Sequence, residues 1–261
     1  MGYYIRVDGN IKIYVEDINP EGNKTILFLH GWPGSHKLFE YQFDQLPKMG
    51  YRCIGIDQRG FGESDKPFEG YNYDRLSDDV RGVVDTLKLK NFTLAGHSTG
   101  GAIAIRYMSR HKEYGVSKLA LISAADFGGD IDKKFVNDII QGTYNDRPNM
   151  LRGFGNIFFY QHITEAFSDW FFQLGLQAAG WATAGTANAW FESLTPDLGK
   201  ISVPTVILHG IHDKVIPFPL AEAQKQGIKN SKLVPFEFSG HGVFYDQKDK
   251  FNSELTQFIE G

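Results

Sequence analysis

The sequence predicts a doubly wound α/β fold whose sheet is mostly parallel and which carries a helical insertion. Short strand-like segments alternate with longer amphipathic ones over most of the chain, as in a sheet covered by helices on both faces. Several of the short segments are continuous apolar runs, as central parallel strands require. The alternation stops between residues 126 and 200, where no good strand is found, so we expect a helical cap there.

The expected elements follow one another in a regular order. Seven short segments are predicted to be strands: residues 11–15, 25–30, 51–56, 92–96, 118–123, 203–209 and 231–238. Five amphipathic segments are predicted to be helices: residues 37–49, 73–87, 99–111, 219–226 and 250–259. We therefore divide the chain into an α/β core domain, residues 1–125 and 201–261, and a helical cap, residues 126–200, inserted after the sixth core strand.

Composition excludes several classes of protein. The 261 residues are enough for one large α/β domain with an insertion, or for two small domains. The net charge of −4, with both signs dispersed, leaves no basic surface for nucleic acid. No apolar run approaches the ~18 residues of a membrane span, and no signal-peptide core is found, so we expect no membrane association and a cytoplasmic location. The only cysteine, Cys53, lies in an apolar run and is expected to be a buried structural thiol.

The most informative motif is Gly96-His97-Ser98-Thr99-Gly100, which joins a predicted strand to a predicted helix. In a nucleophile elbow, a serine at a sharp strand-to-helix turn is pushed out of the sheet. Small residues are needed two before and two after it, because a Cβ there would collide with the turn. The helix directs its N-terminus at the serine, so the N–H of Thr99 faces any oxyanion that forms. The motif predicts Ser98 as the nucleophile and Thr99 as an oxyanion donor.

A serine nucleophile needs a base, so the elbow predicts an acid and then a histidine downstream. His241 lies in a loop directly after the last predicted strand, and Asp213 lies just beyond the strand before it. Both residues should therefore project from the same sheet edge as Ser98, as base and acid. Asp126, just beyond the strand 118–123, is an alternative position for the acid in this architecture.

The second oxyanion donor is expected in the loop His30-Gly31-Trp32-Pro33-Gly34. Gly31 lets the chain turn close to the elbow, which places the N–H of Trp32 to donate, while Pro33 has no N–H and stiffens the loop. Three other histidines at strand ends, His30, His97 and His209, are expected to be packed or hydrogen-bonded rather than catalytic. No clustered metal ligands, dinucleotide fingerprint or P-loop is found in the sequence, so we expect no metal and no cofactor.

Motifs over nearly the whole chain outside the cap carry a family resemblance. They lie at residues 30–33, 50–52, 55–65, 96–101, 203–205, 209–210 and 240–242. With them the chain resembles the α/β-hydrolases of the bacterial arylesterase and cofactor-free haloperoxidase (perhydrolase) group. The resemblance implies that Ser98, Asp213 and His241 form a catalytic triad, and that the Trp32 and Thr99 amides form the oxyanion hole. In that group the Trp-Pro pair matching residues 32 and 33 is also associated with perhydrolysis, in which the tryptophan carbonyl is shifted toward bound peroxide.

Some positions depart from this group. Gly34 is more like the epoxide hydrolases, and Gln58 stands where the group usually has a basic residue. Epoxide hydrolases and haloalkane dehalogenases place an aspartate at the elbow, where this chain has Ser98, so both chemistries are set aside. The charged loop 57–65 is expected to be a structural turn in which Arg59 pairs with a carboxylate.

The predicted cap is rich in aromatic side chains, and residues 171–190 carry no charge. Most of these aromatics should bury the cap onto the core, whereas a few line an apolar acyl or aryl pocket above Ser98. The candidate substrate-binding residues are Pro33, Phe158, Trp181, Trp190 and Val243. This composition disfavours phosphorylated, CoA-linked and nucleotide substrates.

The sequence as a whole predicts a serine carboxylesterase that hydrolyses small, moderately apolar carboxylic esters through an acyl-enzyme, with perhydrolase side activity. The enzymatic alternative is a carbon–carbon bond hydrolase or a cyanohydrin lyase that uses the same triad. From a different class, the chain could be a receptor or binding protein on the same scaffold. The intact triad and both oxyanion positions speak against that alternative. The expected partner is a small-molecule ester, and the sequence leaves open whether the protein is a monomer or a homo-oligomer.

Overall fold

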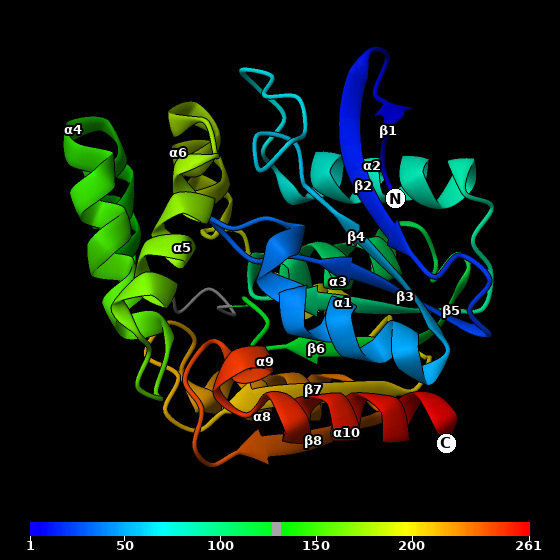
Figure 1. The fold of residues 1–261 in the computed structure, drawn as a ribbon. Coiled ribbons are helices and arrows are strands. Elements are labelled where there is room, and N and C mark those ends of the chain that lie inside the picture. Colours follow the sequence, from blue (N-terminus) through cyan, green and yellow to red (C-terminus); the bar gives the residue numbers. More distant parts are fainter. Residues whose placement is uncertain (127–131) are drawn as a thin grey trace.

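The structure, a computed structural model, describes residues 1–126 and 132–261. Within these residues eight strands form one sheet in the order β1-β2-β4-β3-β5-β6-β7-β8 (Figure 1). Strand β2 is antiparallel to β1 and β4, and all other neighbouring strands are parallel. The strands are β1 (Gly2–Val7), β2 (Ile11–Ile18), β3 (Lys24–Leu29), β4 (Tyr51–Ile56), β5 (Phe92–His97), β6 (Val116–Ile122), β7 (Thr205–Gly210) and β8 (Ser231–Phe236).

Helices cover both faces of this sheet, which confirms the predicted doubly wound α/β fold. In Figure 1, α1 and α10 lie in front of the sheet, and α2 and α3 lie behind it. Helix α1 contacts α9 and α10, α2 packs on α3, and α8 packs on β7 and β8. The bounds are α1 (Glu40–Gln45), α2 (Tyr73–Thr86), α3 (Thr99–Arg110), α8 (Phe218–Gly227), α9 (Val243–Asp246) and α10 (Lys248–Glu260).

Two elements differ from the sequence prediction. Strand β1 is absent from the predicted strands because it pairs only with β2 at the sheet edge, where buried and more exposed residues largely alternate and no apolar run forms. Counting β1, the strand before the insertion is the sixth. The predicted helix 37–49 is instead the short helix α1 between two 3₁₀ turns, His36–Phe39 and Leu46–Met49. Pro47 lies in the second turn, where its missing N–H interrupts α-helical hydrogen bonding.

The segment between β6 and β7 is helical, as the sequence indicates. Figure 1 places α4, α5 and α6 beyond the carboxyl ends of the parallel strands. Helix α4 is kinked at Asp146, whose side chain accepts the Asn149 N–H (3.1 Å) and caps a second helical stretch that contains Pro148. The bounds are α4 (Lys133–Phe158), α5 (Glu165–Leu176), α6 (Gly180–Ala189) and α7 (Thr195–Leu198). The division into a core domain and a cap domain at residues 126 and 200 stays a prediction. Among the described helices none combines the length and the apolar composition that crossing a membrane requires.

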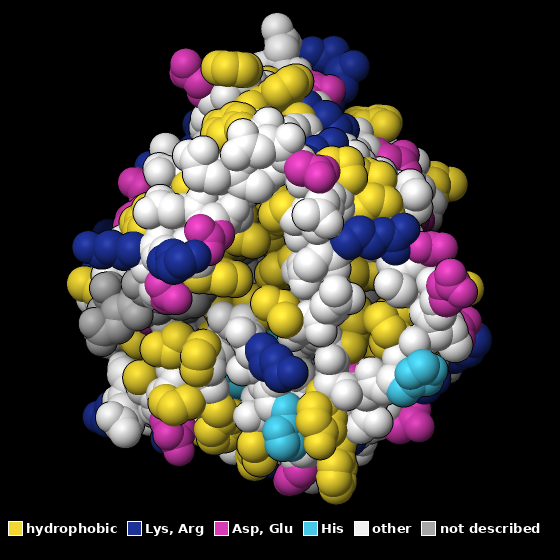
Figure 2. All heavy atoms as spheres, turned by 90° about the vertical axis from the view of Figure 1, so that its left-hand side faces the viewer, with side chains coloured by type: hydrophobic (Ala, Val, Ile, Leu, Met, Phe, Trp, Pro, Cys, Tyr) yellow, Lys and Arg dark blue, Asp and Glu magenta, His cyan; other side chains and the backbone are white. Residues whose placement is uncertain are grey.

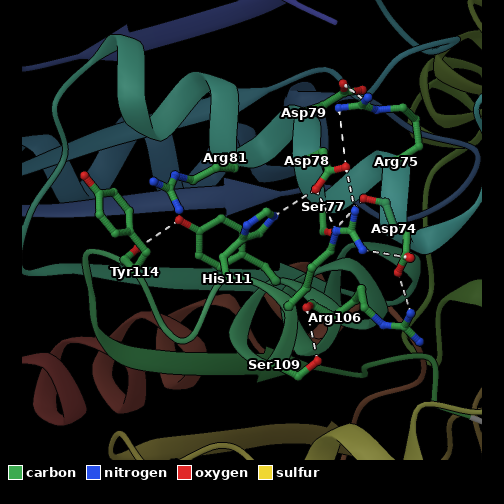
Figure 3. A network of polar contacts seen from close by, with 12 residues as sticks. Asp74, Arg75, Ser77, Asp78, Asp79, Arg81, Arg106, Ser109, His111 and Tyr114 are labelled. Atoms are coloured by element: carbon green, nitrogen blue, oxygen red, sulfur yellow. Dashed lines mark hydrogen bonds and ion pairs between the residues drawn. The ribbon is translucent and has the colours of Figure 1, made fainter.

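Arg106 of α3 ties the end of this insertion to the core helices. Its guanidinium donates to Asp74 of α2 (Figure 3). It also donates to Asp197 of α7 (2.8 Å) and to Glu192 (2.6 Å). A single exposed ion pair contributes only about 0–1 kcal/mol. The Arg106 side chain, however, is only 17% exposed and binds three carboxylates at once. It therefore fixes where residues 192–197 lie relative to α2 and α3.

Two expectations about buried polar side chains are confirmed. Cys53 is buried in β4, and burial raises the pKa of its thiol to about 12, so the unreactive thiol form persists. Arg59 is 2% exposed and donates twice to Asp79, once over 2.7 Å, with Asp8 a further partner at 3.1 Å. Removing either member of the buried pair would leave an uncompensated charge, which makes this loop a structural turn.

Candidate active site

Ser98 lies at the turn from β5 to α3 in a conformation that non-glycine residues rarely adopt. Its backbone has φ 52° and ψ −122°, and it is the N-cap residue of α3. Added Cβ atoms at Gly96 and Gly100 would lie 2.4 Å and 2.3 Å from backbone oxygens of Gly100 and Leu29. Only glycine therefore fits on either side of the turn, as a nucleophile elbow requires. Sparsely populated backbone of this kind costs about 1–3 kcal/mol and is retained chiefly at functional sites.

His241 and Asp213 form a buried pair. His241 Nδ1 lies 2.8 Å from Asp213 Oδ2, and both side chains are fully buried. Asp213 Oδ1 accepts the N–H groups of Val215 and Ile216, each over 2.8 Å. Burial raises the pKa of Asp213, but His241, His209 and the Ile216 N–H outweigh burial and hold it below its usual value. The carboxylate is therefore ionised and keeps the proton of His241 on Nδ1, which leaves Nε2 as the basic nitrogen.

The basic nitrogen of His241 is available for proton transfer. Nε2 is buried and has no hydrogen-bond partner within residues 1–126 and 132–261, so it forms no bond to Ser98 Oγ in this structure. Bonds of this kind are often long before substrate binds. His97, the neighbour of Ser98, lies directly against the histidine, because its Nε2 donates to the His241 carbonyl (3.1 Å) and the two rings are 4.7 Å apart.

The loop after β3 approaches the elbow from the other side. A Cβ added at Gly31 would lie 2.8 Å from Ser98 Cβ and 2.4 Å from His97 Nδ1, so this loop touches the elbow only because residue 31 is glycine. The backbone N–H groups of Trp32 and Thr99 donate to no acceptor in the described part of the chain. Trp32 follows Gly31 and Thr99 follows Ser98, so both N–H groups belong to residues next to the contact between this loop and the elbow. An oxyanion hole requires unbonded donors of this kind.

Asp126 has a different role from Asp213. Its side chain is buried, and its Oδ1 accepts the N–H of Leu194 (3.2 Å), near the end of the insertion. The structure thus places Asp213, rather than Asp126, at the bonding position on His241 Nδ1. His30 and His209 are also bonded into the framework: Gln58 N–H donates to His30 Nε2 (3.0 Å), and His209 Nε2 donates to the Ile216 carbonyl (2.8 Å).

Aromatic rings from the insertion meet the residues around Ser98. The Trp190 indole donates to Thr99 Oγ1 (3.0 Å), and its ring contacts Trp32 edge-on at 5.1 Å. Trp32 in turn donates its indole N–H to the Thr183 carbonyl of α6 (3.0 Å). Phe158, at the end of α4, is fully buried with its ring edge-on to His241 at 4.9 Å. Trp32, Phe158 and Trp190 thus form an aromatic wall beside the elbow.

The five candidate substrate-binding residues are not all brought together. Phe158 and Trp190 belong to the aromatic wall, and Val243 is buried at the start of α9, two residues after His241. Pro33 faces α5, because a Cβ added at Gly175 would lie 3.3 Å from its ring. Trp181 differs: it is 42% exposed, donates to the Pro67 carbonyl (2.9 Å) and contacts the exposed Phe68 ring. An aromatic residue in the predicted cap can contact a surface loop or line a pocket, and the sequence alone does not distinguish the two positions.

Sequence reasoning missed a main-chain contact at His241. The carbonyl of Phe158 accepts the N–H groups of His241 (2.8 Å) and Gly242 (3.1 Å). Phe158 was expected only as a side chain that lines a pocket. Every residue has a backbone carbonyl, so no residue type could have signalled this contact.

The order of these parts along the chain matches a known family. A sequence profile described as the alpha/beta hydrolase fold matches residues 24–248, which is most of the chain and includes Ser98, Asp213 and His241. The chain belongs to the α/β-hydrolase fold family. Among its relatives within α/β-hydrolases, an AB hydrolase superfamily protein, YisY, from Bacillus subtilis is 46% identical over 99% of both chains. The bifunctional esterase/perhydrolase DCH from Acinetobacter calcoaceticus is 30% identical over 99% of both chains.

Solved structures of α/β-hydrolases agree. An esterase from Exiguobacterium antarcticum, EaEST, is 42% identical, covers 100% of both chains and superposes with a TM-score of 0.96. Together with the named esterase/perhydrolase relative, this similarity confirms the predicted resemblance to the arylesterase and haloperoxidase group. The insertion is part of the match, because the whole of each chain is covered.

Proposed function

We propose that this α/β-hydrolase is a serine carboxylesterase that hydrolyses small, moderately apolar esters through an acyl-enzyme. The observation that carries the proposal is the buried pair of His241 and Asp213. The other ring nitrogen of His241, Nε2, has no partner among the described residues, and the His241 ring packs against His97, the neighbour of Ser98. The similarity to a solved esterase at 42% identity supports the same chemistry. A non-catalytic receptor would not need a strained serine beside two unbonded backbone N–H groups.

The reaction follows from the positions of these groups. Ser98 Oγ attacks the ester carbonyl carbon while His241 Nε2 takes the hydroxyl proton, and the negative charge formed on the carbonyl oxygen accepts bonds from the Trp32 and Thr99 N–H groups. The imidazolium, stabilised by Asp213, then gives its proton to the leaving alcohol oxygen, and the acyl group stays on Ser98. Water, deprotonated by the same Nε2, attacks the acyl-enzyme and releases the carboxylic acid.

The preference for an apolar acyl or aryl group rests on what surrounds the elbow. The rings of Trp32, Phe154, Phe158 and Trp190 contact one another in a chain, with ring separations of 4.9 to 5.7 Å. Figure 2, which looks onto the insertion, shows hydrophobic side chains spread over this face and reaching its middle, where a Lys or Arg side chain also lies, while most other charged side chains lie toward the edges. Residues 171–190 contribute no charge. Such surroundings favour apolar substrate groups over phosphate-bearing ones.

A perhydrolase side activity is the second proposal. It is supported by the 30% identical relative named an esterase/perhydrolase, and by the Trp32-Pro33 pair in the loop that touches the elbow. Hydrogen peroxide would then replace water as the nucleophile toward the acyl-enzyme, and the products would be a peracid and free Ser98. The reaction needs no metal, since the same base takes the proton from peroxide.

The test of the main proposal is turnover of p-nitrophenyl acetate, butyrate and octanoate by the wild type and by Ser98→Ala. We expect turnover of at least the shorter esters, and a loss on the order of 10⁶-fold in the variant, as for other triad serines. A β-diketone assayed in parallel separates an esterase from a carbon–carbon bond hydrolase. Turnover of the diketone without turnover of any ester would contradict the esterase proposal.

A further inference from the structure

One carboxylate holds the loop of the proposed base to the end of helix α4. Asp246, the last residue of α9, is half-buried, and its Oδ2 accepts the N–H groups of Gly240 (2.8 Å) and Tyr160 (2.9 Å). Its Oδ1 accepts the N–H of Gln161 (3.1 Å). Tyr160 and Gln161 lie two and three residues after the end of α4, whereas Gly240 immediately precedes His241. Asp246 thus joins two segments that lie about eighty residues apart in the sequence.

The same two segments are also joined in the opposite direction. The carbonyl of Phe158 accepts the N–H groups of His241 and Gly242, as described above. A Cβ at position 240 would lie 3.0 Å from the Phe158 oxygen and from the Tyr160 nitrogen, and a Cβ at position 242 would lie 2.5 Å from the Phe159 ring. The Gly-His-Gly sequence therefore lets the loop lie in direct backbone contact with residues 158–161.

These bonds determine where His241 can lie. A carboxylate that accepts backbone N–H groups makes charge-assisted hydrogen bonds, which are roughly twice as strong as neutral ones. Without Asp246, the Phe158 carbonyl and a bond from Gln161 Nε2 to the Phe238 carbonyl (2.9 Å) would be left to hold the loop to the insertion on this side. The His97 side chain would still hold the His241 carbonyl from the elbow. The direction of the imidazole thus depends on the insertion as well as on the core.

We propose that Asp246 is a positioning residue for His241, and that through it the placement of the base depends on the helical insertion that covers the site. The inference rests on the proposed esterase function and deepens it. Asp246 acts through His241, which transfers protons in the transition state. Its hydrogen bonds go to the backbone N–H groups of Gly240, Tyr160 and Gln161, none of which belongs to the aromatic wall. Its loss should therefore lower kcat with little change in KM.

The test compares Asp246→Ala, Asp246→Asn and the control Asp249→Asn, which changes an exposed acid in the first turn of α10. We expect Ala to lower kcat for p-nitrophenyl acetate on the order of 10- to 100-fold, the effect of a misplaced catalytic group, with KM nearly unchanged. Asn should restore part of kcat, because its one carbonyl oxygen can still accept from Gly240 and Tyr160. The control should keep wild-type kcat.

Backbone amide exchange provides a readout that does not depend on catalysis. In Asp246→Ala the amides of Gly240, Tyr160 and Gln161 should exchange faster than in the wild type, while the central strand amides of β5 are unchanged. Wild-type kcat in Asp246→Ala, or unchanged exchange at these three amides, would overturn the inference. Equal losses in the Ala and Asn variants, with early thermal unfolding of both, would also overturn it, because they indicate a merely structural role. A wild type that turns over no ester would instead contradict the proposed function, and amide exchange would still decide the role of Asp246.

Discussion

The side chain of His97 donates a hydrogen bond from Nε2 to the backbone carbonyl of His241, over 3.1 Å. A carbonyl only accepts, so Nε2 must carry the proton, and the ring is neutral or protonated. Burial, with a smaller effect of the nearby His241, lowers the pKa of His97 well below its usual value. His97, the residue before Ser98, is thus a neutral donor that connects this turn to the backbone of His241.

This neutral histidine predicts a loss of stability in mild acid. In the unfolded chain a histidine has a pKa of about 6.5, whereas folded His97 resists protonation, so the unfolded state binds more protons below that pH. The contribution of His97 is fully present above about pH 6.5 and is lost as the pH falls below it. Burial also lowers the pKa values of His30 and His209, which act in the same direction.

The measurement is the free energy of unfolding in urea at several pH values for the wild type and for His97→Phe. The variant should lose about 1 kcal/mol at high pH, from the missing hydrogen bond. Its stability should then fall less steeply than that of the wild type between about pH 7 and pH 5. Parallel curves for the two proteins would show that folding does not lower the pKa of His97.

The acid should be Asp213. Asp213→Asn should lower kcat by roughly 10⁴-fold, since a neutral amide favours the wrong imidazole tautomer. Asp126→Asn is the matched change at the rival position, and it should alter kcat little because Asp126 caps the Leu194 N–H instead. Ester turnover at saturating substrate measures both effects. A larger loss in Asp126→Asn than in Asp213→Asn would reverse the assignment.

The peroxide side reaction should depend on Pro33. Replacing Pro33 by Leu relaxes the Trp32 carbonyl, while the triad and both amide donors stay in place. Peracid formation from acetate and hydrogen peroxide, measured without added metal, should therefore fall by more than ester hydrolysis does. Equal losses of the two activities would mean that the proline acts only on folding or on general site geometry.

The sequence predicted those parts of the site that depend on residue type. A nucleophile elbow needs small residues around its serine, and its acid and histidine follow at the ends of later strands. Each of these requirements can be recognised from residue type and position in the sequence. The parallel strands were likewise predictable, because burial on both faces requires apolar runs. The edge strand β1 leaves no such run, since one of its faces is largely exposed.

Other parts could not be predicted because they depend on which segments meet in space. The Phe158 carbonyl and the Asp246 carboxylate bind backbone N–H groups, which every residue except proline offers. Trp181 is an aromatic residue of the kind that lines apolar pockets, but its indole donates to the Pro67 carbonyl at the surface. In each case the partner is brought near by the tertiary fold.

The acyl-enzyme itself tests the account most directly. The wild type is mixed briefly with excess p-nitrophenyl acetate, quenched in acid, digested and analysed by mass spectrometry, in parallel with the burst of p-nitrophenol. We predict a burst that approaches one equivalent per active site where deacylation limits turnover, and one acetyl group on the peptide that contains Ser98. In Ser98→Ala both should be absent. Ester turnover that persists in Ser98→Ala, or an acetyl group found on another residue while the Ser98 peptide stays unmodified, would contradict the account.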